Sequence, residues 1–481
     1  MSVRVGKTST APAFPIAAHT ALANQQLRAN VARATNTIRG KRAIRVEEMP
    51  DWQALRQTAS DIKSHTLAHL DHYLTEFERN CERVGGKVHW ARDADEANTI
   101  AIELIRHYGG TEVIKVKTMT SDEVQMNVAL EAAGITPIET DLADMIVQMG
   151  HDEPSHIVVP ALHKNRFEIA EIFRRTMNLP GLTDTPEDLA AAARAYLRDR
   201  FLRVRIGISG ANFAVAETGA ICVVESEGNG RMCVTMPDVL ITLVGVEKVI
   251  PTFQDLEVFL QLLPRSATGE RMNPYNSLWT GVTPGDGPQA FHVILLDNGR
   301  TAQLLDERER ETLACIRCGA CLNACPVYRE TGGLAYGSIY SGPIGAILSP
   351  QLQNLQHSRS LPYASTLCGA CYEVCPVKIN IPETLIHLRG RIVREDQKTF
   401  TGKLAAENIA MQFAAKIFLD HRRYEAAQKL ARTGQLLFER QGQLTNLPGM
   451  AGGWTKYRDL KPIPKSSFRD WWKSREKESR S

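Results

Sequence analysis

A cysteine motif that occurs twice, fifty residues apart, constrains this chain more than any other feature. The first copy reads Cys-Gly-Ala-Cys-Leu-Asn-Ala-Cys-Pro-Val from Cys318, and the second reads Cys-Gly-Ala-Cys-Tyr-Glu-Val-Cys-Pro-Val from Cys368. Cys315 precedes the first copy, which therefore has the full C-x2-C-x2-C-x3-C-P spacing of bacterial ferredoxins. The motif predicts [4Fe–4S] clusters.

The spacing also predicts which cysteines act together. In two-cluster proteins of this type, three closely spaced cysteines bind one cluster, and the fourth, which precedes proline, binds the other. Two ligand sets follow: Cys315, Cys318, Cys321 and Cys375 for the first cluster, and Cys325, Cys368 and Cys371 for the second.

The second set lacks a fourth cysteine, because Ser365 occupies the position that matches Cys315. Three arrangements stay open: a [3Fe–4S] cluster, a [4Fe–4S] cluster with a non-cysteine or external fourth ligand, or a cubane completed by Cys81, Cys222 or Cys233. We expect two iron–sulfur clusters, with [4Fe–4S] as the favoured type.

Zinc sites and disulfide bonds are the alternatives for such cysteine pairs. A structural zinc site needs four ligands and gives no role to a crossing cysteine followed by proline. Disulfide bonds need an exported chain, and we recognise no signal peptide. The spacing therefore favours iron–sulfur binding in a reducing cytoplasm.

The whole chain has the composition of a globular protein, with 481 residues, 43% of them hydrophobic and 23% charged. No apolar run approaches the roughly 18 residues that a membrane span needs. We therefore expect no transmembrane segment, and any membrane contact should be peripheral, on the inner face. The net charge of +3 is too small to indicate nucleic-acid binding.

Residues 1–50 are predicted to form a basic N-terminal arm, because no acidic residue precedes Glu47. Two explanations remain open: a transit peptide, or an arm that packs on or near a partner. The basic residues are Arg4, Lys7, Arg28, Arg33, Arg39, Lys41, Arg42 and Arg45.

Residues 51–300 are predicted to form an α/β domain. An apolar stripe at helical spacing opens it, and strands and helices alternate after Gly85-Gly86, which indicates a parallel sheet covered on both faces. We expect one of the strands at His156 to Val159. Asn229-Gly230 lies between two apolar runs and predicts a hairpin.

Three features of this domain could carry chemistry. Glu217 beside Gly219 is a weak catalytic candidate that could act as nucleophile or base, or cap a helix N-terminus. The pair Lys115 and Lys117 ends a predicted strand, and His163-Lys164 could form an anion pocket. Spacing supplies no second catalytic group, so structural roles are favoured.

Residues 301–395 are predicted to form an α-helical ferredoxin-type domain, with Tyr328, Tyr336 and Tyr340 covering the clusters. Residues 396–481 are predicted to form a helical C-terminal domain. Its tail, 456–481, carries nine Lys or Arg against four Asp or Glu, together with Phe468, Trp471 and Trp472. Such a tail could dock a protein or a membrane face, or pack across its own domain.

Taken together, several motifs of the chain resemble those of the lactate utilization protein B (LutB) family of bacterial iron–sulfur proteins. Besides the cysteine motifs they are Gln26-Leu27-Arg28, Ile38-Arg39, Val88-His89-Trp90-Ala91, Lys115-Val116-Lys117-Thr118-Met119, Glu139-Thr140-Asp141-Leu142, Pro154 to Lys164, Ala216-Glu217-Thr218-Gly219 and Ser467 to Trp472.

The resemblance implies a LUD domain similar in fold to the NagB/RpiA/CoA-transferase group over residues ~70 to 300. It also implies a three-component complex that oxidises L-lactate to pyruvate without flavin and supports growth on lactate. The partners would be a second iron–sulfur or cysteine-rich subunit and a separate LUD-domain subunit. The same cysteine assignment carries over, and three cysteines in the second motif are common in the family. Neither the lactate site nor the electron acceptor is implied.

The sequence therefore predicts an electron-relay subunit, an oxidoreductase component rather than a stand-alone catalyst. One alternative is an acyl- or CoA-transfer enzyme that uses Glu217, with structural clusters. Another is an iron–sulfur redox sensor, although no DNA-binding helix pair or basic recognition stripe is visible.

Overall fold

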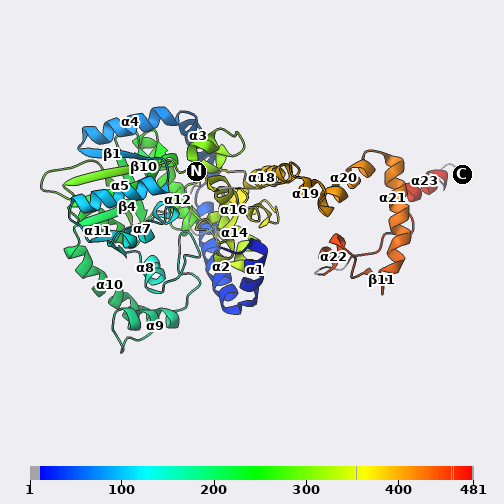
Figure 1. The fold of residues 1–481 in the computed structure, drawn as a ribbon, viewed down its shortest axis with the longest axis horizontal. Coiled ribbons are helices and arrows are strands. Elements are labelled where there is room, and N and C mark those ends of the chain that lie inside the picture. The colour runs from blue at the N-terminus through cyan, green and yellow to red at the C-terminus, as the bar shows by residue number, and fades with distance from the viewer. Residues whose placement is uncertain (1–10, 354, 457, 459, 479–481) are drawn as a thin grey trace. The chain divides into compact units, whose positions relative to one another are not determined.

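A computed structural model describes residues 11–353, 355–456, 458 and 460–478. They fall into two compact units that divide between Ile392 and Val393 (Figure 1). The first unit contains the α/β region and both cysteine motifs, and the second contains the C-terminal helices.

A six-stranded parallel sheet forms the centre of the first unit. Its strands, in spatial order, are β1 Gly86–Ala91, β10 Ala290–Leu296, β7 Val239–Gly245, β4 Ile206–Gly210, β2 Glu112–Lys115 and β3 Thr136–Glu139. The central strand β7 is apolar and buried along its whole length, as expected when helices cover both faces of a parallel sheet.

Alternate residues of β7 point to the two faces. Ile241 packs in a core with α5 (Ala94–His107) and α7 (Met126–Ala132). Leu240 packs in another core with α4 (Leu70–Arg83) and α11 (Asn229–Thr235). The predicted parallel sheet covered on both faces is confirmed.

A smaller four-stranded sheet and further helices complete the α/β region. The sheet has the order β8 Val249–Ile250, β5 Phe213–Val215, β6 Ala220–Glu225 and β9 Tyr275–Trp279. The helices are α3 Trp52–Ala68, α6 Met119–Glu123, α8 Leu142–Met149, α9 Arg166–Thr176, α10 Pro186–Arg203, η1 Val246–Lys248, α12 Phe253–Ala267 and α13 Arg300–Leu304.

Two local predictions were wrong. Asn229-Gly230 begins the helix α11 instead of a hairpin, because Gly228 takes a left-handed conformation (φ 85°) and starts a helical turn. His156 to Val159 is an irregular segment and not a strand, because its backbone N–H groups turn to the imidazole of His156.

The segment predicted as a basic arm is helical where the structure describes it. It forms α1 (Phe14–Ala23) and α2 (Gln25–Glu47), which pack on the cysteine-motif region of the same chain. Arg4 and Lys7 lie outside the described residues.

The cysteine-motif region is helical, as predicted. Its elements are η2 Arg310–Ala314, α14 Ala320–Ala324, α15 Pro326–Thr331, η3 Leu334–Tyr336, α16 Gly342–Leu352, η4 Leu361–Tyr363, α17 Ala370–Val374 and α18 Ile381–Asp396. Tyr328, Tyr336 and Tyr340 are buried here.

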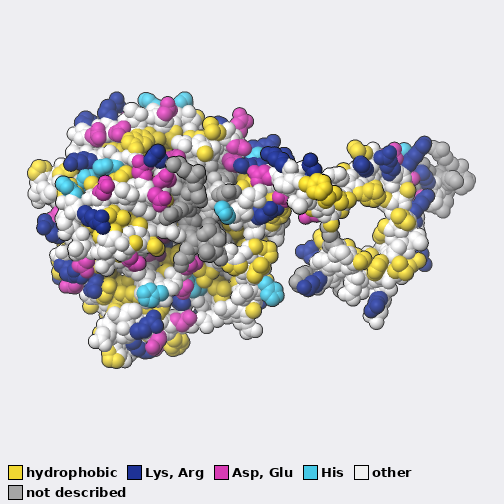
Figure 2. Space-filling view, in the orientation of Figure 1, with side chains coloured by type: hydrophobic (Ala, Val, Ile, Leu, Met, Phe, Trp, Pro, Cys, Tyr) yellow, Lys and Arg dark blue, Asp and Glu magenta, His cyan; other side chains and the backbone are white. Residues whose placement is uncertain are grey.

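The second unit is mainly helical, as predicted. It contains α19 Phe400–Lys403, α20 Ala406–Phe418, α21 His421–Gly434, η5 Gln435–Leu437, the hairpin β11 Glu439–Arg440 with β12 Gln443–Leu444, α22 Met450–Thr455 and α23 Phe468–Glu478. Neither α20 nor α21 buries a side chain fully, and apolar side chains show on the surface of this unit (Figure 2). Across the described parts of the chain, no helix is long and apolar enough to span a membrane.

Candidate metal centre

Four cysteines from both motif copies line one small cavity. Cys315, Cys318 and Cys321 come from the first copy, and Cys375 comes from the second. Burial raises the pKa of the Cys375 thiol to about 11, and the neighbouring Cys315 adds to that rise. The structure thus brings together the four residues that the spacing assigns to one cluster.

The remaining motif cysteines form a second group. Burial raises the pKa of the Cys371 thiol to about 12, and its neighbours Cys325 and Cys368 raise it further. Cys325 and Cys371 are buried, whereas Cys368 is exposed. Cys371 also lies close enough to Cys321 of the first group to raise the pKa of that thiol, so the two groups are neighbours.

The two loops have matching backbones. Gly319 and Gly369 take left-handed conformations, with φ of 73° and 84°. The residues before the first cysteine of each copy, Arg317 and Leu367, are also left-handed, with φ of 61° and 55°. Such conformations are strained for residues other than glycine, so both copies hold the same tight turn before a short helix.

The residues around the first group fit an iron–sulfur cluster. The backbone N–H of Ile379 donates to Cys375 Sγ at 3.4 Å, and that of Arg317 donates to Cys315 Sγ at 3.4 Å. Hydrogen bonds of this kind stabilise thiolate ligands and tune cluster potentials.

Several buried polar groups near the motif cysteines lack well-formed hydrogen bonds among the residues that the structure describes. They are Tyr336 Oη, the Asn323 amide and His156 Nε2. Burial lowers the pKa of His156 to about 3, and its Nδ1 accepts from the N–H groups of Val158 and Val159. Nε2 therefore carries the proton, next to Asn323 and the Gly319 turn. Sulfide and thiolate are suitable acceptors for such donors.

Two arginines from the N-terminal helices hold the second motif. Arg56 of α3 donates to Cys375 O at 2.9 Å and to Tyr372 O at 3.1 Å. Arg42 of α2 donates to Val374 O at 3.0 Å. These carbonyls end α17, where a positive charge is favourable. Sequence reasoning missed both roles, because only tertiary packing brings these helices to the motif.

A buried ion network joins the first loop to the α/β sheet. Arg300 binds Glu123 through two hydrogen bonds of 2.8 Å and contacts Glu247 at 2.5 Å. Glu247 also pairs with Arg317 at 3.2 Å, and Tyr340 donates to Glu123 at 2.6 Å. The cations hold the pKa of Glu247 down to about 2 despite its burial.

The remaining cysteines lie in the α/β region. Burial raises the pKa of the Cys81, Cys222 and Cys233 thiols to about 12. Cys81 and Cys233 pack in the core around α4 and α11, apart from the core that contains Cys325 and Cys371. The hydroxyl of Ser365 accepts from Leu367 N at 3.1 Å and so stabilises the turn before Cys368.

Glu217 is exposed and accepts a hydrogen bond from Phe253 N at 2.9 Å, at the start of α12. This contact is the capping role that the sequence left open. The other predicted candidates have partners of their own: Lys115 is paired with Glu139 at 2.6 Å, while His163 and Lys164 both contact Asp152, at 3.0 and 2.6 Å. Lys117 lines a separate cavity.

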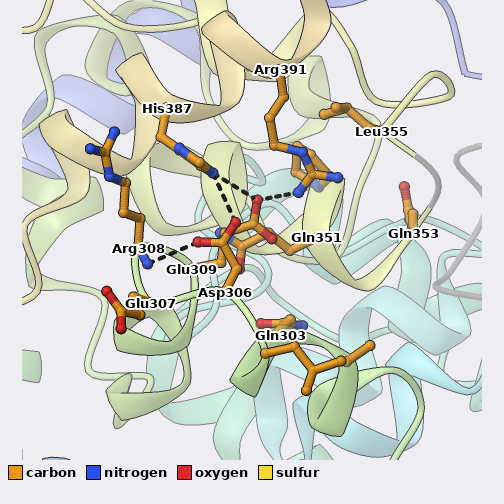
Figure 3. A pocket seen from close by; sticks show the side chains of 13 residues that line it. Gln303, Asp306, Glu307, Arg308, Glu309, Gln351, Gln353, Leu355, His387 and Arg391 are labelled. Carbon is orange, nitrogen blue, oxygen red and sulfur yellow. Dashed lines mark hydrogen bonds and ion pairs between the residues drawn. The ribbon is translucent and has the colours of Figure 1, made fainter. Parts of the chain in front are cut away.

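A further pocket of about 630 Å³ lies between α18 and the segment after α13 (Figure 3). His387 and Arg391 extend from α18 towards Asp306 and Glu309. One ligand atom each from His387, Asp306 and Glu309 lies within 4.8 Å of the others, a spacing that a metal ion could bridge. In the structure His387 is hydrogen-bonded to Asp306 at 3.1 Å and Arg391 pairs with Glu309, so these contacts connect α18 to the loop before η2.

The fold and the cysteine loops define an iron–sulfur protein with an α/β domain, and comparison with known families agrees. Residues 74–296 match the LUD domain, 311–379 match the 4Fe-4S dicluster domain, and 389–477 match the C-terminal domain of lactate utilisation protein B.

Curated relatives cover almost the whole chain. A lactate utilization protein B from Bacillus licheniformis is 42% identical over 462 residues, 95% of each chain. One from Oceanobacillus iheyensis is 41% identical over 99% of this chain and 98% of its own, and one from Bacillus subtilis is 40% identical over 95% of both. The chain belongs to the lactate utilization protein B family.

Proposed function

We propose that the chain is the iron–sulfur electron-transfer subunit of an L-lactate utilisation complex and relays electrons from the oxidation of L-lactate to pyruvate. The observation that carries the proposal is the meeting of Cys315, Cys318, Cys321 and Cys375 in one small cavity, beside a second cysteine group. The names of the relatives supply the substrate.

One-electron transfer is the chemistry that iron–sulfur clusters supply. The residues of this chain favour a relay because one cysteine group borders the α/β region while Cys368 of the other is exposed. Arg42, Arg56 and Arg317 place positive charge around the loops and so favour the reduced state.

We propose two clusters of the [4Fe–4S] type, with Cys315, Cys318, Cys321 and Cys375 holding the first and Cys325, Cys368 and Cys371 holding the second. The fourth ligand of the second would be Cys222, which packs in the same core as Cys325 and Cys371, or a non-cysteine or external group; otherwise that cluster would be [3Fe–4S]. The buried positions of Cys81 and Cys233 in another core argue against their taking this role.

The partners that we propose are a second iron–sulfur or cysteine-rich subunit, a separate LUD-domain subunit and an electron acceptor, in the cytoplasm or on the inner membrane face. Exposed apolar side chains of the C-terminal unit support a protein partner; they include Phe413, Phe418, Leu419, Leu430 and Leu437.

The first experiment is anaerobic purification followed by iron and sulfide analysis and electron paramagnetic resonance (EPR). We expect about eight irons per chain and two reducible signals. Cys375→Ser should remove the first signal and reduce iron by about half, whereas the control Cys81→Ser should keep both. Zinc in place of iron would refute the proposal.

The second experiment tests the alternative of a transferase that uses Glu217. Glu217→Gln should leave lactate-dependent dye reduction by the co-purified complex within about twofold of the wild type, because Glu217 caps α12. Loss of activity in a variant with normal clusters and normal melting temperature would favour the transferase.

A further inference from the structure

A cavity of about 330 Å³ lies at the carboxyl ends of the parallel strands of the six-stranded sheet. Lys117 follows β2, Asp141 follows β3, Ala211 follows β4 and Lys248 follows β7, and all four line the cavity. Open α/β sheets bind ligands at this edge, and the volume suits a small molecule.

The cavity borders the first cysteine group. Ile157 lines both the cavity and the space among the four cysteines of that group. Arg317, which stands between Cys315 and Cys318 in the motif, also lines the cavity. A ligand bound here would therefore lie next to the first cysteine loop.

Three cationic side chains line the cavity, and each has N–H groups without an acceptor among the described residues. Arg317 uses Nη2 for Glu247, but its buried Nη1 has no hydrogen-bond partner among the described residues. Lys248 is buried, and its ammonium forms no hydrogen bond or close ion pair in the described part of the chain; Glu247 is near enough to attract it electrostatically, but burial still lowers the pKa of Lys248 to about 8. Lys117 donates to Val158 O at 2.9 Å, which leaves two N–H groups. Buried cations without partners are costly unless an anion joins them.

The carboxylates of the lining are already engaged by backbone N–H groups. Asp141 accepts from Ala143 N at 3.0 Å, Glu225 accepts from Glu227 N at 2.7 Å, and Glu227 accepts from Leu142 N at 3.0 Å. Burial of the Glu227 carboxyl and the neighbouring Asp141 raise its pKa to about 7, so an added negative charge beside these carboxyl groups is unfavourable. This arrangement favours a singly charged anion over a polyanion such as phosphate.

We propose that this cavity binds a small 2-hydroxycarboxylate, whose carboxylate contacts Arg317, Lys248 and Lys117. Thr268 Oγ1 and Asn273 Oδ1, buried lining atoms without partners among the described residues, can bond the ligand's hydroxyl group. The choice of L-lactate as the ligand rests on the proposed function, whereas the anion site rests on the contacts above.

The test is isothermal titration calorimetry on the full-length, anaerobically prepared chain with sodium L-lactate, neutral lactamide and inorganic phosphate. We expect L-lactate to bind and the other two to bind at least tenfold more weakly. Lys248→Gln and Lys117→Gln should each weaken L-lactate binding about ten- to a hundredfold, because each removes a charge-assisted hydrogen bond. Lys87→Gln, which changes an exposed lysine of β1, should bind as the wild type does.

Unchanged L-lactate affinity in a folded Lys117→Gln or Lys248→Gln variant would overturn the site, as would equal binding of lactamide. Tighter binding of phosphate would overturn the 2-hydroxycarboxylate class. EPR of the same samples separates this inference from the proposed function: iron-loaded protein that binds no lactate refutes the cavity alone. Iron-free protein refutes the relay, and its calorimetry still decides the cavity.

Discussion

Arg317 shows how one residue can serve two parts of the molecule. The motif places it between two predicted cluster ligands, and its side chain pairs with Glu247 and stacks over Tyr340, with its guanidinium carbon 4.8 Å from the ring centroid. Glu247 in turn pairs with Arg300. Removal of one member should leave a buried charge without a counter-ion, which is more costly than the net value of the pair.

Glu247→Gln should lower the free energy of unfolding by about 3 kcal/mol or more, because Arg317 would lose its carboxylate partner and Arg300 would keep only Glu123. Chemical denaturation followed by circular dichroism measures the change. Glu217→Gln provides the matched control, since it alters an exposed carboxylate, and should shift the midpoint little. Equal shifts in the two variants would contradict this account of the network.

His292 should make stability depend on pH. It is buried in β10 and hydrogen-bonded to His89 at 3.0 Å and to Tyr108 at 3.0 Å. Burial, and secondarily the charges of His89, Lys87 and His107, lower its pKa from 6.5 to about 4. Between these values the unfolded chain binds a proton that the folded chain does not, so stability should fall as pH falls from 6.5 to 4.

Thermal unfolding at several pH values checks this expectation. His292→Gln should flatten the loss of melting temperature between pH 6.5 and pH 4, although its stability at pH 7.5 should be somewhat lower. If the melting temperature of the variant depended on pH as that of the wild type does, His292 would not contribute to the pH dependence of stability.

At the scale of elements, helices α2 and α3 stabilise the second cysteine motif through hydrogen bonds. α17 has only five residues and cannot be stable alone, so its carbonyls depend on Arg42 and Arg56. These contacts explain why the N-terminal segment, which the sequence marks only by its basic residues, packs as helices on the cysteine-motif region.

Arg56→Gln should lower the free energy of unfolding by about 1 to 3 kcal/mol, because two charge-assisted hydrogen bonds to α17 are lost. It should also shift the potential of the first EPR signal to more negative values, since a positive charge next to Cys375 is removed. Potentiometric EPR titration measures the shift. The control Arg33→Gln changes an arginine of α2 that makes no contact with α17 among the described residues. It should leave the potential unchanged.

For the whole molecule, the two units differ in how completely they bury apolar side chains. The first unit packs its apolar residues in continuous cores, whereas α20 and α21 of the second leave Phe413, Phe418 and Leu430 more than 60% exposed. Apolar patches of this kind are typical of protein interfaces.

The double variant Phe413→Glu/Phe418→Glu should keep iron content and EPR signals while co-purification of partner subunits falls at least tenfold. Pull-down from cells grown on lactate, with quantitative mass spectrometry, measures the change. Glu407→Gln on the same helix serves as the control. Full retention of the partners would assign the interface to another surface.

The sequence by itself predicted that the seven motif cysteines form two groups and that strands and helices alternate in the α/β region. Both features depend on spacings of a few residues, which can be read directly from the chain. It also left Glu217 open between catalysis and capping, and the structure adds a hydrogen bond from Phe253 N to its carboxylate. The predictions of a hairpin at Asn229-Gly230 and of a strand at His156 were wrong. Gly228 in a left-handed conformation starts a helix at the first site, and the His156 imidazole accepts backbone N–H groups that a strand would use at the second.

Only the tertiary structure decided which distant groups meet. Lys117, Lys248 and Arg317 share one cavity, and Glu123, Glu247 and Arg300 share one buried network. Their separations in sequence follow no period, so no local pattern marks them. Their meeting depends on how the sheet and the cysteine loops pack, which is set by the fit of whole surfaces rather than by neighbouring residues.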